Sequence, residues 1–268
     1  MTDIPPYRSS IPGRLGATGT VAGDELIVHL AARPETTHLG ALRASVLAFA
    51  ADSVAGVTVD DDPEQWSFTS ELALRMRSQP PTGPLEARTE VLRRGRRSST
   101  CTVRMSGPDG ELHAHSVLTF AHVGRRPGDP EKPNQLGRQG FHGWGVGIEP
   151  LDRPLREAAG IEVVDAAHGV IELALNDNLL NPAGALQGAM TALVVECGAE
   201  EFVGHRVGAP VLVTELDIRY LGQSNVGPVC SSCRLLGDGP DAAVEVQLVD
   251  TGVDRISTLA YARAVPVS

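Results

Sequence analysis

The chain contains one stretch of sequence twice, at a constant offset of 144 residues. Residues 37–52 read THLGALRASVLAFAAD, and residues 181–196 read NPAGALQGAMTALVVE. The same offset aligns Asp52 with Glu196 and the Gly-Pro pair at 83–84 with that at 227–228. No insertion is needed over roughly 85 residues, so we interpret the pattern as a true duplication. Two copies are typical of a pseudo-symmetric pair of domains that share one interface, as in a two-fold dimer.

Each copy holds a long apolar segment with a single carboxylate inside it. In residues 181–203 apolar residues fall on all sides with small residues between them, which predicts a helix that is buried all round. The first copy predicts a matching helix over residues 37–55. An unpaired buried charge is costly, so Asp52 and Glu196 are each expected to have a partner or a chemical role.

Alternating apolar residues between turn signals predict strands on either side of these helices. In the first half the expected strands are 25–31, 66–77, 85–92, 97–105 and 112–123; in the second half they are 163–175 (as one strand or a pair), 211–221, 229–236, 242–249 and 256–265. Strands grouped around single helices predict an α+β fold with two curled antiparallel sheets, each wrapped around a central helix.

Composition shifts suggest where the domains begin and end. Residues 1–20 are rich in Pro, Gly and Ser and are expected to form a loose N-terminal extension. The two domains then cover residues 21–123 and 151–268. Residues 124–150 are dense in Gly and Pro and predict a linker between them.

Charge and cysteine usage exclude several classes of function. The net charge of −10 argues against a nucleic-acid partner, because phosphate binding needs a basic surface. No long apolar span is free of charge, so no membrane span is expected, and the N-terminus lacks the apolar core of a secretory signal. Four cysteines without a disulfide-framework pattern indicate reduced thiols in a cytoplasmic protein. Cys230 and Cys233 lack a second such pair, so no metal site is predicted.

The second helix segment resembles a known family. The pattern N-x-x-G-x-x-[H/Q]-G, with a carboxylate nine residues after the His/Gln position, is matched by Asn181, Gly184, Gln187, Gly188 and Glu196. It resembles the PaaI-like acyl-CoA thioesterases of the hotdog fold. The second copy carries the match throughout and the first copy carries it in degraded form. The resemblance implies a tandem, or double, hotdog protein.

The resemblance also implies an active site between two hotdog units. One unit supplies the Asn side chain and the N–H at the helix N-terminus, which polarise the thioester carbonyl. The partner unit supplies the helix carboxylate, often with a Ser or Thr from the next strand. Helix N-termini present free N–H donors where an oxyanion forms, and a buried carboxylate serves as base or nucleophile. Coenzyme A enters only as part of the acyl-CoA substrate, no separate cofactor is implied, and such proteins commonly assemble into homo-oligomers.

Two copies create two sites with different residues. The first site has the complete set: Asn181, Gln187, Gly188, Asp52 and Thr69, with Ser70 replacing Thr69 if the register slips by one residue. The second site has drifted: Thr37, Arg43, Ala44, Glu196 and Val213. We therefore expect one complete site, with Asp52 as its catalytic carboxylate and Glu196 as the second choice.

The predicted activity is thioester hydrolysis. Many relatives have His-Gly-Gly where this chain has Gln187, Gly188 and Ala189. Glutamine donates a hydrogen bond but cannot shuttle a proton, which argues against His-dependent chemistry. The missing His leaves open a non-catalytic acyl-CoA or lipid-binding protein. A dehydratase of the same fold is disfavoured because its Asp-x-Asn-Pro-x-His signature is absent.

A basic cluster at 93–97 offers a further candidate site. Arg94, Arg96 and Arg97 could contact the phosphates of coenzyme A, because the arginine fork suits phosphate. The alternative, which we favour, is a solvated hairpin tip. Arg43, expected one turn into the first helix, is another candidate for phosphate.

Overall fold

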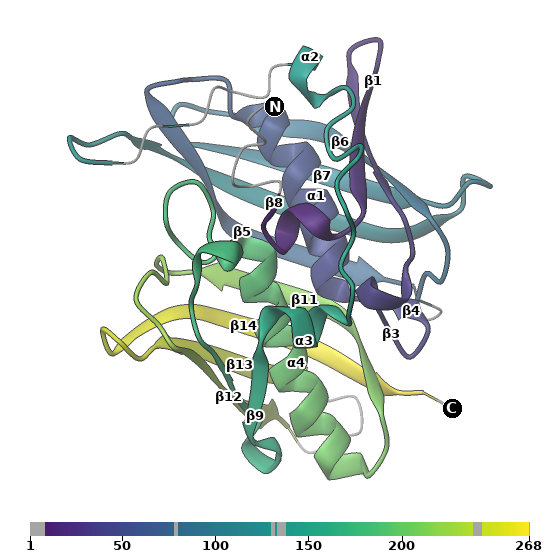
Figure 1. Ribbon diagram of the computed structural model, residues 1–268, viewed down its shortest axis with the longest axis vertical. Coiled ribbons are helices and arrows are strands. Elements are labelled where there is room, and N and C mark those ends of the chain that lie inside the picture. Colours follow the sequence, from purple (N-terminus) through teal and green to yellow (C-terminus); the bar gives the residue numbers. More distant parts are fainter. Residues whose placement is uncertain (1–8, 78–79, 130–131, 133–137, 238–242, 268) are drawn as a thin grey trace.

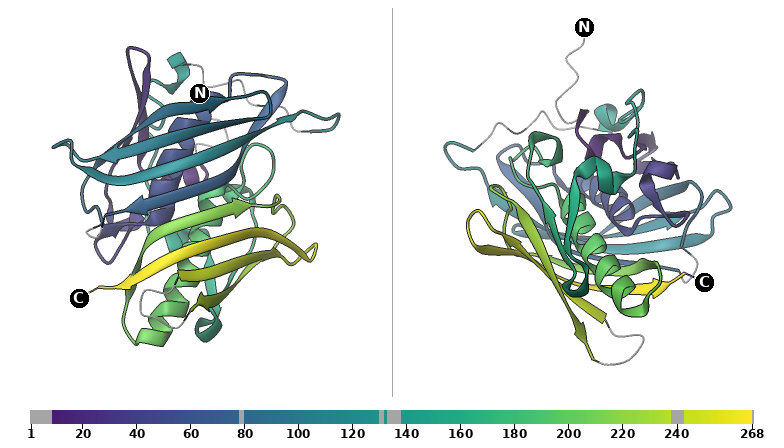
Figure 2. Two further views of the ribbon diagram at one scale, coloured as in Figure 1. Left: turned by 180° about the vertical axis from the view of Figure 1, so that it is seen from behind. Right: turned by 60° about the horizontal axis from the view of Figure 1, so that its bottom comes forward.

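The structure is a computed structural model that describes residues 9–77, 80–129, 132, 138–237 and 243–267. Two long helices, α1 (Ala44–Val59) and α4 (Gly188–Val207), lie against one face of a curved antiparallel sheet (Figure 1). The sheet has 12 strands in the order β1-β2-β6-β7-β8-β5-β11-β14-β13-β12-β10-β9. The α+β class is confirmed. The expectation of two separate sheets is wrong, because the half-sheets join edge to edge; Figure 2 shows the joined sheet from behind.

Each half of the chain contributes six strands to this sheet. The first half supplies β1 (Ala17–Ala22), β2 (Glu25–Leu30), β5 (Gln65–Met76), β6 (Leu85–Arg94), β7 (Ser98–Ser106) and β8 (Leu112–Gly124). The second half supplies β9 (Ile161–Asp165), β10 (Val170–Leu173), β11 (Val211–Tyr220), β12 (Val229–Leu236), β13 (Ala243–Asp250) and β14 (Arg255–Pro266). The expected strand at 163–175 is therefore a pair of strands.

Shorter elements connect these strands and helices. A separate hairpin is formed by β3 (Thr37–His38) and β4 (Ala41–Leu42). The short helices are α2 (Arg138–Phe141), α3 (Leu155–Ala159) and the single 3-10 turns η2 (Pro12–Arg14), η3 (Pro34–Thr36), η4 (Ala166–His168) and η5 (Asp177–Leu179). None of the helices in the described ranges has both the length and the apolarity needed to cross a membrane.

The half-sheets join where β5 pairs antiparallel with β11. The paired residues run from Arg75 opposite Glu215 to Glu71 opposite Arg219. Next to this seam the register shifts between Thr69 and Glu71 in β5 and between Val213 and Glu215 in β11. These irregularities stand 144 residues apart, so the duplication extends to the backbone of the strands. Because the pairing ends at Arg219, the two strands separate there and leave room between the halves.

Both long helices are buried over most of their length. In α4 all residues from Ala189 to Glu200 are buried, and α1 buries Val46, Leu47 and Phe49 among others. Each helix packs on its own half-sheet, and the two helices also contact each other. This confirms the expectation drawn from their apolar and small residues, since no helical face is polar enough to remain in water.

The helices begin later than their sequences suggest. Residues 37–43 and 181–187 were expected to be helical, but both fold into turns that include a glycine in the left-handed region, Gly40 at φ 82° and Gly184 at φ 79°. In the second turn the Asn181 side chain accepts hydrogen bonds from the backbone N–H groups of Ala183 at 2.9 Å and Ala185 at 3.1 Å. Such local side-chain bonds compete with helix formation.

The ends of the first half pack more tightly than their composition suggests. Leu15 is fully buried and residues 17–22 form β1, so the described part of the expected extension 1–20 belongs to the core; residues 1–8 lie outside the described residues. Within the expected linker, Trp144 stacks on Phe141 with ring centroids 5.7 Å apart and packs against Phe49 of α1 at 6.1 Å. Gly19 of β1 allows Phe141 to lie this close to the strand, since a Cβ at residue 19 would lie 2.5 Å from the Phe141 carbonyl oxygen.

Candidate functional site

Asp52 of α1 faces the N-terminus of α4 in the other half of the chain. A Cβ added to Gly188, the first residue of α4, would lie 3.9 Å from Asp52 Oδ2. The Thr69 hydroxyl on β5 donates a hydrogen bond to Asp52 Oδ1, whereas the Ser70 hydroxyl donates to the Thr119 carbonyl oxygen. The structure thus brings together the carboxylate, hydroxyl and helix N-terminus of the first predicted site, and Thr69 rather than Ser70 supplies the hydroxyl.

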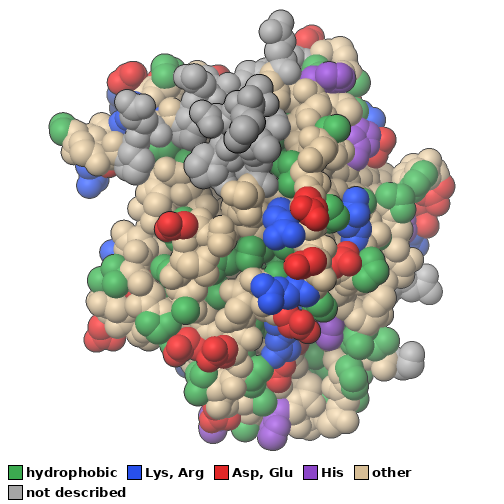
Figure 3. Space-filling model, viewed as in Figure 1, with side chains coloured by type: hydrophobic (Ala, Val, Ile, Leu, Met, Phe, Trp, Pro, Cys, Tyr) green, Lys and Arg blue, Asp and Glu red, His purple; other side chains and the backbone are tan. Residues whose placement is uncertain are grey.

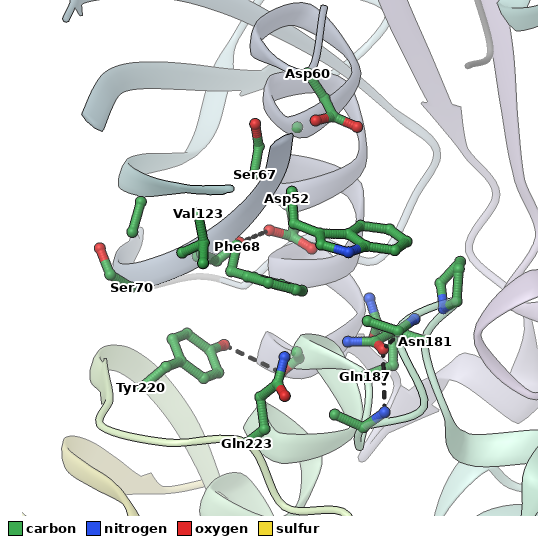
Figure 4. Close-up of a pocket in the computed structure, with 18 of the residues that line it drawn as sticks. Asp52, Asp60, Ser67, Phe68, Ser70, Val123, Asn181, Gln187, Tyr220 and Gln223 are labelled. Atoms are coloured by element: carbon green, nitrogen blue, oxygen red, sulfur yellow. Dashed lines mark hydrogen bonds between the residues drawn. The ribbon is translucent and has the colours of Figure 1, made fainter. Parts of the chain in front are cut away.

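A cavity of about 850 Å³ surrounds these groups (Figure 4). From the first half it is lined by polar residues that include Asp52, Ser53, Asp60, Ser67, Thr69 and Ser70. The second half contributes Asn181, Gln187, Gly188, Thr191, Tyr220 and Gln223. Its aromatic lining consists of Trp66, Phe68, Phe141 and Trp144. The cavity is therefore built by both halves and by the segment that connects them.

The surroundings of Asp52 disfavour its charge. Burial raises the pKa of Asp52 to about 6, and the hydrogen bond from Thr69 opposes this rise. The neighbouring Tyr220 phenol also has a raised pKa, first because of burial and second because of the Asp52 charge. A carboxyl group with such a pKa is ionised at neutral pH yet basic enough to accept a proton.

The N-terminus of α4 retains unused hydrogen-bond donors beside Asp52. The Ala189 N–H is capped by Gln187 Oε1 at 2.6 Å, and the Tyr220 hydroxyl donates to the Gly188 carbonyl oxygen at 3.0 Å. Among the described residues, neither the Gly188 N–H nor Gln187 Nε2 has an acceptor. Together with the positive end of the helix dipole, these donors can stabilise an oxyanion.

Asn181 lines the same cavity but its oxygen is used locally. Its Oδ1 holds the turn before α4 through the two backbone N–H groups described above, which leaves Nδ2 as the only donor the side chain can offer a ligand. This turn also positions Gln187, whose own backbone N–H donates to the Leu179 carbonyl oxygen at 3.0 Å.

The second predicted site is closed by its own carboxylate. Glu196 of α4 points at the N-terminus of α1, where it accepts hydrogen bonds from Ala44 N at 2.8 Å, Ser45 N at 3.2 Å and Ser45 Oγ at 2.5 Å. Arg43 lies 3.5 Å from Glu196 and 3.1 Å from Glu200. These residues line neither the cavity described above nor any open space beside α1.

Two predicted roles need correction as a result. Arg43 was a candidate for phosphate, but it is 5% exposed and its guanidinium is already paired with Glu196 and Glu200. Glu196 was the second choice of catalytic carboxylate, but it is 1% exposed and caps α1. Arg43 occupies the position equivalent to Gln187, and its longer, charged side chain reaches both glutamates.

The predicted arginine cluster lies on the surface between β6 and β7. Arg94 donates to Asp61 Oδ2 at 2.6 Å and to the Thr58 carbonyl oxygen at 3.0 Å, and Arg96 and Arg97 are exposed. None of the three lines the cavity. The basic residues that do line it are Arg126, which is exposed, and Lys132, whose Nζ lies 2.7 Å from Asp60 Oδ1.

Several lining residues carried no signal in the sequence. Tyr220, the last residue of β11, reaches the cavity because β5 and β11 separate beside it. Phe141 and Trp144 lie in a segment that reads as a linker. A search of the described ranges finds no group of three or more His, Cys, Asp or Glu side chains that could hold a metal ion.

No protein-family model and no curated protein matches this chain. Solved structures do match it over nearly its whole length. An acyl-ACP thioesterase from Bacteroides thetaiotaomicron is 13% identical, with a TM-score of 0.62 over 89% of this chain and 97% of that one. The 12:0-ACP thioesterase from Umbellularia californica is 11% identical, with a TM-score of 0.61 over 92% and 99%.

A third match identifies the fold by name. A conserved protein of unknown function with a hot dog fold, from Alicyclobacillus acidocaldarius, is 12% identical and has a TM-score of 0.56 over 98% of each chain. At these identities the likenesses show the fold: this chain is similar in architecture to hotdog proteins.

Proposed function

We propose that this hotdog-fold chain hydrolyses acyl thioesters, with acyl-CoA as the substrate, at the cavity between its two halves. The single observation that carries the proposal is the position of Asp52: a carboxyl group with a raised pKa faces the N-terminus of α4, whose Gly188 N–H has no acceptor among the described residues, across a cavity of about 850 Å³. Base and oxyanion donors on opposite sides of one space are what acyl transfer to water requires. The thioesterases among the similar structures support the same class of reaction.

In the proposed reaction the thioester carbonyl oxygen lies against the Gly188 N–H and Gln187 Nε2. Asp52 accepts a proton from a water molecule, whose oxygen attacks the carbonyl carbon. The tetrahedral intermediate carries its negative charge next to the N-terminus of α4, where the helix dipole stabilises it. The carbon–sulfur bond then breaks, the thiol leaves with a proton returned from Asp52, and the acid product remains.

Thr69 and Asn181, which also line the cavity, position the groups that react. Thr69 donates to Asp52 and thereby fixes the orientation of the carboxylate. Asn181 holds the turn that presents Gln187 and can also donate from Nδ2 to the substrate. We further propose that the two halves are tandem hotdog units of the PaaI-like type, since the motif parts of the site are divided between them as they are between paired units of that family.

Steady-state hydrolysis of a panel of acyl-CoA and acyl-carrier-protein thioesters tests the proposal. We expect Asp52→Asn to lower kcat by about a hundredfold or more, as for loss of a general base. The matched variant Glu196→Gln changes the equivalent carboxylate in the closed site and should leave kcat per folded molecule within about twofold. Turnover that survives Asp52→Asn would refute the assignment, and tight acyl-CoA binding without turnover would favour a non-catalytic binding protein.

A further inference from the structure

We infer that the preferred acyl group carries a hydroxyl on its third carbon, which the Ser67–His122 pair recognises. The inference rests on the proposed function in one respect, namely that the thioester carbonyl lies at Asp52. It adds the chemical class of the acyl group, which the catalytic residues alone do not specify.

Ser67 of β5 lines the cavity and is held by a histidine on the neighbouring strand. His122 of β8 stands directly opposite Ser67 in the sheet, and its Nδ1 lies 3.0 Å from Ser67 Oγ. The other ring nitrogen, Nε2, lies 2.9 Å from Oγ of Ser99, a residue that is fully buried. A Ser–His–Ser chain on the helix-facing side of a sheet is a costly way to build a core, because each polar group must be satisfied.

The hydroxyl of Ser67 keeps hydrogen-bonding capacity for a ligand. A serine hydroxyl has one donor and two acceptor lone pairs, and His122 uses only one of these. If Nδ1 carries the proton, Ser67 is free to donate into the cavity; if Nε2 carries it, Ser67 donates to Nδ1 and its lone pairs remain. In either tautomer a substrate hydroxyl can pair with it, because a hydroxyl both donates and accepts.

The position of Ser67 fits the third carbon of an acyl chain. Ser67 and Thr69 lie two residues apart on one face of β5, which corresponds to about 6.6 Å. A hydroxyl on the third carbon, together with a hydrogen bond of about 2.8 Å, spans a comparable distance from a carbonyl carbon held beside Thr69 and Asp52.

The cavity continues on both sides of Asp52. In Figure 4, Ser67 and Asp60 lie on one side of Asp52, and Gln187, Tyr220 and Gln223 lie on the other. Both sides include exposed lining residues: Leu221, beside Tyr220, is 61% exposed, and Val123, which follows the residue paired with Ser67, is 38% exposed. We place the carrier arm of the thioester on the Leu221 side and the acyl group on the Ser67 side.

An unsubstituted acyl chain would pack on Trp66, Phe68 and Val123 at this end but would leave one polar group there without a partner. It would cover the Ser67 hydroxyl with methylene groups and leave its spare hydrogen-bonding capacity unpaired, beside the polar side chains of Ser53 and Asp60. Sites that hydrogen-bond a substrate hydroxyl reject the analogue that lacks it, because their polar groups then lose their partners.

The test compares octanoyl-CoA with 3-hydroxyoctanoyl-CoA in three proteins. The natural chain should hydrolyse the hydroxylated substrate with a kcat/KM at least about tenfold higher. In Ser67→Ala this ratio should fall to about one. The matched control Ser70→Ala removes a hydroxyl from the same strand and cavity, but one that bonds the Thr119 carbonyl oxygen, so the ratio should persist.

Binding to the Asp52→Asn protein separates this inference from the proposed function. Calorimetric titration with the same two compounds should show the same preference, and Ser67→Ala in that background should remove it. Equal turnover of both compounds by the natural chain, or equal binding of both by the Asp52→Asn protein, would overturn the inference while leaving thioester hydrolysis intact. Absence of any turnover together with a preference in binding would refute the hydrolase and support the inference.

Discussion

Asp52 and Glu196 occupy equivalent positions in the two copies, yet their surroundings differ. Each points at the first turn of the helix in the opposite half. Glu196 receives three hydrogen bonds and an arginine, so its charge is compensated inside the protein. Asp52 receives one hydrogen bond from Thr69 and otherwise faces a cavity. The uncompensated residue is the one available for chemistry.

The raised pKa of Asp52 gives a prediction for the pH dependence of activity. As a base Asp52 must be ionised, and burial raises its pKa to about 6. We expect kcat/KM to be constant above about pH 7 and to fall tenfold per pH unit well below 6, because the protonated fraction then dominates. A pH–rate profile with a pH-stable thioester at concentrations well below KM measures this. A limb with a midpoint near 4 would contradict the prediction.

The same pKa predicts a trade-off between activity and stability. Relative to an unfolded carboxyl group at 3.8, the folded pKa of about 6 means that Asp52 favours folding below pH 3.8 and that this contribution is lost as the pH rises through 6. At pH 8 the neutral Asp52→Asn should therefore unfold with a free energy higher by about 1 to 3 kcal/mol.

Urea denaturation at pH 8 and at pH 4 measures this difference. The gain should shrink at the lower pH, where Asp52 is itself protonated. Asp152→Asn, an exposed aspartate outside the cavity, serves as the control and should change stability by less than about 0.5 kcal/mol. Destabilisation by Asp52→Asn at both pH values would contradict the prediction.

At the scale of elements, a buried ion cluster fastens α1 to α4. Arg43 precedes the first residue of α1, and Glu196 and Glu200 lie one turn apart on α4. All three side chains are at most 6% exposed. Removing one member of a buried ion pair leaves the charge of the other member without compensation. The resulting loss in the free energy of unfolding is larger than the stabilisation that the intact pair provides.

We therefore expect Arg43→Ala to lower the free energy of unfolding by about 3 to 5 kcal/mol. Chemical denaturation followed by circular dichroism provides the measurement. Arg97→Ala, which removes an exposed arginine from a hairpin, is the matched control and should cost little. A loss of less than about 1 kcal/mol in Arg43→Ala would mean that the cluster contributes no net anchoring.

The sequence alone predicts the elements better than their ends. The 144-residue offset and the apolar runs predicted both helices and most of the strands, although β1 was expected to belong to a loose extension. The turns before α1 and α4 were missed because Gly40, Gly184 and the Asn181 side chain act through local backbone bonds. Asp52, Thr69 and Gly188 could be grouped because the resemblance to PaaI-like thioesterases implies a site between two units, and the duplication supplies those two units. Tyr220 could not, since alternation along a strand does not reveal where the sheet opens. Trp144 could not, since it lies in a Gly- and Pro-rich segment that reads as a linker.

At the scale of the whole molecule, the two halves form one structure. The sheet is continuous through β5 and β11, α1 contacts α4, and the connecting segment packs its aromatic residues on the first half. Each half therefore leaves an apolar helix face and a strand edge uncovered when separated. Units that share this much interface unfold together.

We expect a single unfolding transition for the full chain. Both tryptophans, Trp66 and Trp144, belong to the first half or its cover, whereas far-ultraviolet circular dichroism reports on all strands and helices. Urea midpoints from tryptophan fluorescence and from circular dichroism should coincide, and calorimetry should give one peak. Separate midpoints would show that the halves are independent domains.

The capping of α1 by Glu196 has a consequence for how such a chain can evolve. In an assembly of two identical subunits, any substitution appears in both interfacial pockets, so neither can be given up without losing the other. Covalent fusion removes that restriction: here one pocket has become a fastening between helices, and the other is left free to tolerate a partly buried, energetically unfavourable carboxyl group.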